Sequence, residues 1–256
     1  MFNRNDDSDV NICENDVDVL YDDMLDCEIS VEEVFNVLKC SKNGKSPGYD
    51  EIPVELYKNQ TMLNALTRVF NICFDSGKVP AMWSKGIITP IPKSSTSDPR
   101  DPLSYRGITL APVSYKLYCG VLNSRLTYKL DDIDFLCDEQ NGFRKGRSTV
   151  DHLSTLSTII ETRKLRKQST YVAFIDFKKA YDWINRNLLF CKLKTLGISS
   201  KMLKSLYSLY NNVQSCVKVR TNRLKHVLSD TSERDYNPNQ EDLTFPVFVE
   251  STYKDK

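Results

Sequence analysis

The sequence predicts an α+β fold that is rich in helices. The chain has 256 residues, 40% of them hydrophobic, which is enough for one large or two modest cores. Several segments carry apolar residues three and four positions apart, the period of an amphipathic helix. Short runs of β-branched and aromatic residues lie between these segments, as expected for the strands of a small sheet.

The first predicted helix begins after Ser30, because Ser30 and Glu33 form the S-x-x-E pattern of a capping box. Glycines and prolines within residues 43–53 exclude regular structure there. Helical spacing returns over residues 62–75, and Gly77 is placed to cap the end of that second helix.

Two strands are predicted next, over Lys85–Pro92 and Tyr105–Leu110. The prolines of the first strand favour a sheet edge or one arm of a hairpin. Residues 113–130 and 150–167 then have the spacing of two long helices with basic positions on their outer faces, and a basic loop separates them.

Residues 170–177 have the composition of a buried strand, with Asp176 at its C-terminal end. Two more helices are predicted over residues 186–196 and 200–210, followed by a strand-like stretch over residues 215–220.

The charge is distributed unevenly, although the net charge is only +1. Residues 1–33 hold 12 acidic side chains against the single base Arg4, and residues 230–256 carry a net charge of −4. Residues 34–229 therefore carry +16. A basic body between acidic ends suggests a polyanionic partner, with the ends solvating or masking the body, and an ordinary charged surface is the alternative.

Both ends of the sequence also lack a helical or strand period. Residues 1–29 are acidic with few large apolar side chains, and are expected to form a flexible lead-in. Residues 229–256 are expected to form a disordered tail, because most of that stretch is polar and aperiodic.

Cysteine and hydropathy patterns exclude two further classes. The eight cysteines form no C-x-x-C pair and His152 lies far from His226, so zinc-site spacing is absent. No apolar run approaches the roughly 20 residues of a membrane helix, and no signal-peptide pattern is present. We therefore expect a protein of the cytoplasm or nucleus, neither secreted nor bound to a membrane, whose thiols are mostly small core residues.

The strongest single feature for chemistry is FIDFKKAYD at residues 174–182. A carboxylate at the end of a buried strand can hold a divalent cation, whose charge offsets that of phosphate. The alternative for Asp176 is a strand-end aspartate that caps the following helix. The residue type alone leaves both interpretations open.

Five stretches, in order, resemble the reverse transcriptase domain of non-LTR retrotransposons over roughly residues 30–220. They are NGKSPGYDEIP at 43–53, ITPIPK at 88–93, SYRGITL at 104–110, QNGFRKGRST at 140–149 and FIDFKKAYD at 174–182. The resemblance implies nucleotidyl transfer by an RNA-directed DNA polymerase. RNA template, DNA primer and deoxynucleoside triphosphates are the implied partners, and Mg²⁺ the implied cofactor.

The same resemblance implies a right-hand polymerase fold, with fingers over residues 30–169 and a partial palm over residues 170–228. Asp176 matches the first metal-binding carboxylate of the family, which bridges the cations at the nucleotide and the primer end. Tyr181 matches the aromatic residue that lies under the sugar and excludes a 2′-hydroxyl by its bulk. Plain packing is the alternative for Tyr181.

Five basic residues complete the implied site. Lys93 and Arg106 match finger positions that cradle the triphosphate. Arg144, Lys145 and Arg147 form a glycine-flanked loop suited to the template backbone, a contact that weakens with salt. Solvated surface charge is the alternative for all five.

Two later motifs of the family are not found after Arg220: a glycine-rich segment and a strand turn with two adjacent aspartates. One carboxylate would balance two cations poorly, so we expect this chain to be catalytically incomplete by itself. A second chain could supply the missing palm. The alternatives are a non-catalytic nucleic-acid-binding remnant and a protein-interaction fragment.

Overall fold

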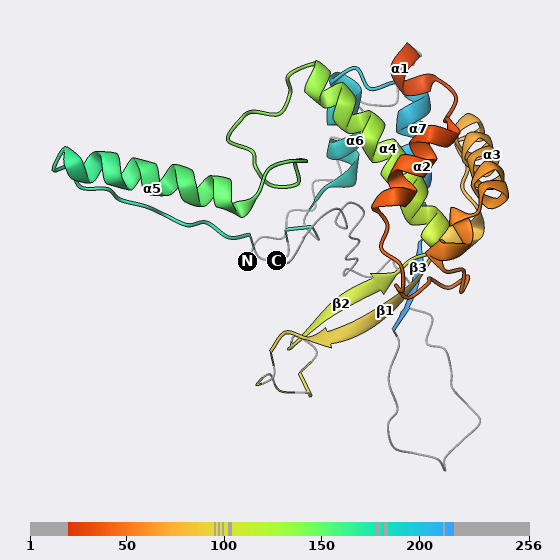
Figure 1. Ribbon diagram of the computed structural model, residues 1–256, viewed down its shortest axis with the longest axis horizontal. Helices are drawn as coiled ribbons and strands as arrows, with labels where there is room; N and C mark the ends of the chain where they lie inside the picture. Colours follow the sequence, from red (N-terminus) through yellow and green to blue (C-terminus); the bar gives the residue numbers. More distant parts are fainter. Residues whose placement is uncertain are drawn as a thin grey trace, which may run out of the picture.

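The computed structural model describes residues 20–217, except residues 95, 97, 99, 102, 103, 178, 179, 182, 183 and 212. This part of the chain is rich in helices and contains a small mixed sheet, which confirms the predicted class (Figure 1). The elements are, in order, α1 (Asp23–Asp26), α2 (Val31–Cys40), the 3-10 helix η2 (Val54–Lys58), α3 (Gln60–Ser76), the 3-10 helix η3 (Ala81–Ser84), β1 (Lys85–Pro92), β2 (Tyr105–Leu110), α4 (Val113–Asp132), α5 (Thr149–Leu165), α6 (Arg186–Thr195), α7 (Ser200–Ser208) and β3 (Gln214–Val217).

The hydrophobic core lies among α1, α2, α3, α4 and α7, which gather on one side of the molecule (Figure 1). Its centre is aromatic: the ring of Tyr118 lies 5.1 Å from that of Phe70 and 5.3 Å from that of Trp83, centroid to centroid. The indole N–H of Trp83 donates a hydrogen bond to the Ser114 hydroxyl at 2.9 Å. Buried N–H and O–H groups of aromatic side chains usually need a hydrogen-bond partner, and Ser114 is the partner of the Trp83 indole.

Local signals in the sequence fix several helix ends. The predicted capping box before α2 is present, since Ser30 Oγ accepts from the Glu33 N–H and the Glu33 carboxylate accepts from the Ser30 N–H. The chain leaves α3 at Gly77, whose φ of 62° lies in the left-handed region that glycine adopts without strain. Both features were predicted correctly.

The sheet has the strand order β2-β1-β3, with β1 antiparallel to β2 and parallel to β3. Both predicted strands are present, and of the two alternatives for the first, a sheet edge or a hairpin arm, the structure has the hairpin arm, with β1 as the central strand. Strand β3 pairs only with residues 85–88 of β1. At Pro90 and Pro92, β1 therefore pairs with β2 alone, and a proline is tolerated where one side of a strand has no partner.

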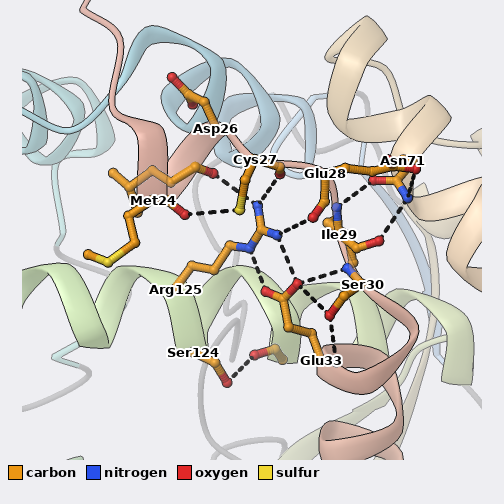
Figure 2. Close-up of polar contacts among 12 residues, drawn as sticks. Met24, Asp26, Cys27, Glu28, Ile29, Ser30, Glu33, Asn71, Ser124 and Arg125 are labelled. Carbon is orange, nitrogen blue, oxygen red and sulfur yellow. Dashed lines mark hydrogen bonds and ion pairs between the residues drawn. The ribbon is translucent and has the colours of Figure 1, made fainter.

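The prediction of a flexible lead-in over residues 1–29 is wrong for residues 20–29, and residues 1–19 lie outside the described part. Residues 23–26 form α1, and Leu25 and Ile29 are each 1% exposed. Figure 2 shows why: the guanidinium of Arg125, on α4, donates to backbone carbonyls of this segment and to the Glu33 carboxylate. Hydrogen bonds from the buried Arg125 thus hold residues 25–28 in place, although the low apolar content of the segment predicted flexibility.

Two expectations about the middle of the chain are also wrong. Helix α5 forms, but none of its residues is buried, so it has no inner face, and in Figure 1 it stands apart from the core helices. Residues 170–177 form no strand, and residues 171–177 are all exposed. A segment with strand composition needs a neighbouring strand, and the sheet of the described residues provides none for it.

The expectation of core thiols holds only in part. Cys73 and Cys119 are buried, and burial raises the pKa of the Cys73 thiol to about 11 and that of Cys119 to about 12. Cys27, Cys40 and Cys137 are exposed, because they lie at a helix end or in a loop. Among the described helices, none has the length and hydropathy needed to span a membrane.

Candidate functional site

The β1–β2 hairpin brings two of the predicted site residues together. Arg106 of β2 pairs with Ile91 of β1, and the ladder continues past β1, where the Lys93 N–H donates to the Ser104 carbonyl at 2.9 Å. Side chains directly opposite one another share a face, and so do residues two apart on one strand. The register therefore puts Lys93, one residue beyond β1, and Arg106 at diagonal positions of the hairpin, which lie roughly 7–8 Å apart on one face of a regular ladder.

Both side chains on this face are exposed. Two cations so close together repel each other, and an anion between them relieves that repulsion. The guanidinium of Arg106 can meet two phosphate oxygens at once, while Lys93 contributes a compact point charge. The hairpin face can thus hold a polyphosphate.

The basic loop, residues 136–148, is held by its own side chains. Nη1 of Arg144 donates to the carbonyl of Cys137 at 3.0 Å, and Nη2 of Arg147 lies 2.8 Å from the Asp138 carboxylate. Two of the three basic residues predicted to contact template therefore also have structural partners. Lys145 lies between them and is exposed.

The 136–148 loop also reaches Tyr181, which the sequence did not predict. The rings of Phe143 and Tyr181 meet edge to face, with 6.2 Å between centroids and an angle of 76° between planes. The 136–148 loop, predicted to contact the template, therefore touches Tyr181, predicted to contact the nucleotide. Sequence reasoning missed Phe143, although an aromatic residue next to the base Arg144 is a signal for nucleic-acid contact.

Asp176 lies in the exposed, irregular segment described above. Within the described residues, no group of three or more His, Cys, Asp or Glu side chains is placed to hold a metal ion. The donors that the structure describes therefore do not make up the two-cation site that the resemblance implies. Oxygen ligands in addition to Asp176 would be needed for such a site.

Comparison with known proteins gives the class of this chain. Residues 91–226 match the family described as reverse transcriptase (RNA-dependent DNA polymerase). That match includes β2 with Arg106, Lys93, the 136–148 loop, Asp176 and Tyr181, but only the last two residues of β1. The chain belongs to this family, as the five motifs predicted.

Similar proteins come from mobile elements. The probable RNA-directed DNA polymerase from transposon X-element of Drosophila melanogaster is 31% identical over 153 residues, covering 59% of this chain and 17% of that protein. The RNA-directed DNA polymerase from mobile element jockey of the same species is 28% identical over 171 residues, covering 66% and 18%. The Pol polyprotein of the type-1 retrotransposable element R2 of Nasonia vitripennis is 21% identical over 191 residues, covering 75% and 18%. The chain thus spans less than a fifth of each of these relatives.

Proposed function

We propose that this chain forms the fingers and the first part of the palm of a right-hand RNA-directed DNA polymerase from a non-LTR retrotransposon. The fingers would cover residues 30–169 and the partial palm residues 170–228, while the prediction for residues 229–256 falls outside the described residues. The placement of Lys93 and Arg106 on one hairpin face is the observation that carries the proposal. Those two positions came from the family motifs, and their shared hairpin supports a common role in binding an anion.

In this proposal the hairpin face holds the triphosphate of an incoming deoxynucleotide, and Tyr181 lies against its sugar. The 136–148 loop follows the backbone of the RNA template, with Lys145 as its exposed cation. Asp176 would supply one carboxylate toward Mg²⁺, and a complete site would need further oxygen ligands. The DNA primer end would be placed beside Asp176.

Replacing Arg106 with alanine should weaken binding of a deoxynucleoside triphosphate about tenfold, because a charge-assisted contact to phosphate is lost. The measurement is the dissociation constant of dATP for the full chain by competition with a fluorescent nucleotide. Arg68→Ala is the matched control, since Arg68 is an exposed arginine of α3, away from the hairpin. Equal losses in the two variants would refute the assignment of the hairpin face.

Primer extension on an RNA template tests the polymerase reaction itself. We expect the full chain to bind the primed template at low salt and to add no nucleotides, because Asp176 alone does not complete the metal site. Wild type and Asp176→Ala are compared in the presence of Mg²⁺, with binding measured in the same samples. Extension that Asp176→Ala abolishes would refute catalytic incompleteness and support the polymerase role directly.

The same experiment separates the proposal from a non-catalytic nucleic-acid-binding remnant. A polymerase site couples template, triphosphate and divalent cation, so Mg²⁺ should tighten binding of dATP to the primed complex. Salt-sensitive template binding that neither Mg²⁺ nor dATP changes would favour the remnant.

A further inference from the structure

We propose that Phe143 positions Tyr181, and through it sets the preference of the nucleotide site for deoxyribonucleotides over ribonucleotides. This inference rests on the role proposed above for Tyr181 and extends it to a residue of the 136–148 loop. Phe143 would be a positioning residue, since it acts on the nucleotide only through the tyrosine ring.

The ring contact has the geometry of an attractive aromatic pair. Edge-to-face rings with centroids about 4.5–7 Å apart place the positive edge of one ring against the negative face of the other. The Phe143–Tyr181 pair, at 6.2 Å and 76°, lies within that range. Yet neither ring is buried: Phe143 is 77% exposed and Tyr181 is 49% exposed. Core packing therefore does not explain why the two rings meet.

The backbone at Phe143 has an unfavourable conformation that its surroundings maintain. Its φ is 61°, a left-handed value that a bulky side chain adopts only at a cost. Hydrogen bonds on both sides hold the loop in this shape: Gln140 Nε2 donates to the Gly142 carbonyl at 3.1 Å, and Arg144 donates to the Cys137 carbonyl. Strain that a surrounding network maintains is typical of functional positions.

Tyr181 needs such a partner, because it lies in a turn outside any helix or strand. A tyrosine can exclude a 2′-hydroxyl only while its ring stays in place, since a ring free to rotate would make room for the extra oxygen. The contact with the Phe143 ring removes part of that freedom. Loss of the contact should therefore relax discrimination more than it weakens binding of the correct nucleotide.

The test measures dissociation constants of dATP and ATP for the full chain bound to a primed RNA template, so that no turnover is needed. In Phe143→Ala, the ratio of the ATP constant to the dATP constant should fall about 2- to 10-fold, with most of the change in ATP. Phe143→Tyr keeps a ring edge and should keep the wild-type ratio. Phe35→Ala, which removes an exposed phenylalanine of α2, is the matched control and should leave the ratio unchanged.

A double-mutant cycle separates positioning from other effects. In a Tyr181→Ala background, Phe143→Ala should have no further effect on the ratio. An unchanged ratio in Phe143→Ala alone, or an equal change in both backgrounds, would overturn the positioning role while leaving the nucleotide site intact. If Tyr181→Ala itself leaves the ratio unchanged, or neither nucleotide binds, the proposed role of Tyr181 fails and the inference fails with it.

Discussion

Replacing Arg125 with methionine should lower the free energy of unfolding by about 3–5 kcal/mol, because the change removes a buried cation paired with the half-buried Glu33 and leaves carbonyl groups without their donor. Arg125 is 7% exposed and makes five hydrogen bonds: two with the Glu33 carboxylate, and one each with the carbonyls of Leu25, Cys27 and Glu28. Methionine fills a similar volume but donates none of them. Three carbonyls would then lack this donor, and the Glu33 carboxylate would keep only the hydrogen bonds from Ser30.

Urea unfolding at neutral pH measures the effect, and Arg68→Met provides the control. Arg68 is exposed on α3, so its replacement should change the unfolding free energy by no more than about 0.5 kcal/mol. Similar values for the two variants would show that the Arg125 network contributes no more than a surface charge.

The pH dependence gives an independent check on the same pair. Burial alone would raise the pKa of Glu33, but hydrogen bonds from Arg125 and from the Ser30 backbone outweigh it, and the net pKa lies below the ordinary 4.5. A carboxyl with a lowered folded pKa stabilises the fold above its unfolded pKa, and this contribution is lost as pH falls through the folded value. The stability difference between wild type and Arg125→Met should therefore narrow well below pH 4.5.

Gly48→Ala should destabilise the protein by about 3 kcal/mol, at the upper end of ordinary overpacking. A Cβ at this position would lie 2.3 Å from the backbone nitrogen of Pro112 and 2.4 Å from the carbonyl carbon of Ala111. Those atoms connect β2 to α4 and cannot move without shifting both elements. Thermal unfolding of the full chain measures the loss.

Gly142→Ala is the matched control for Gly48→Ala. Its Cβ would meet only the side-chain amide of Gln140, at an ordinary 3.5 Å, so its stability should stay within about 0.5 kcal/mol of wild type. Comparable destabilisation in both glycine variants would contradict a specific role for the contact with residues 111–112, because restricting the unfolded chain would by itself stabilise the protein. The expected contrast would establish that Gly48 is needed for close approach of the 43–53 motif to the β2–α4 junction.

Much of the fold could be read from local pattern because its causes are local. The capping box at Ser30 and the Gly77 cap each depend on a few neighbouring residues. Lys93 and Arg106 were identified from two motifs, and the register of the hairpin then set their relative positions.

Other features depend on residues far apart in the sequence, and there local pattern failed. Arg125 holds residues 25–28 in place from about 100 positions further along the sequence. The acidic segment itself contains no signal that identifies this distant arginine as its hydrogen-bond partner. The exposed segment 170–177 is the opposite case: its composition favours a strand, but a strand forms only where another strand pairs with it.

The sequence by itself determined the family of this protein, the positions of most helices and the identity of the chemical side chains, because motifs, caps and periodicity are local properties. Only the tertiary structure decided which of those side chains meet. It placed Lys93 beside Arg106, used Arg144 and Arg147 to hold their own loop, and set Phe143 against Tyr181. Such contacts depend on how the chain folds and on which partner each side chain finds there, and neither can be derived from composition.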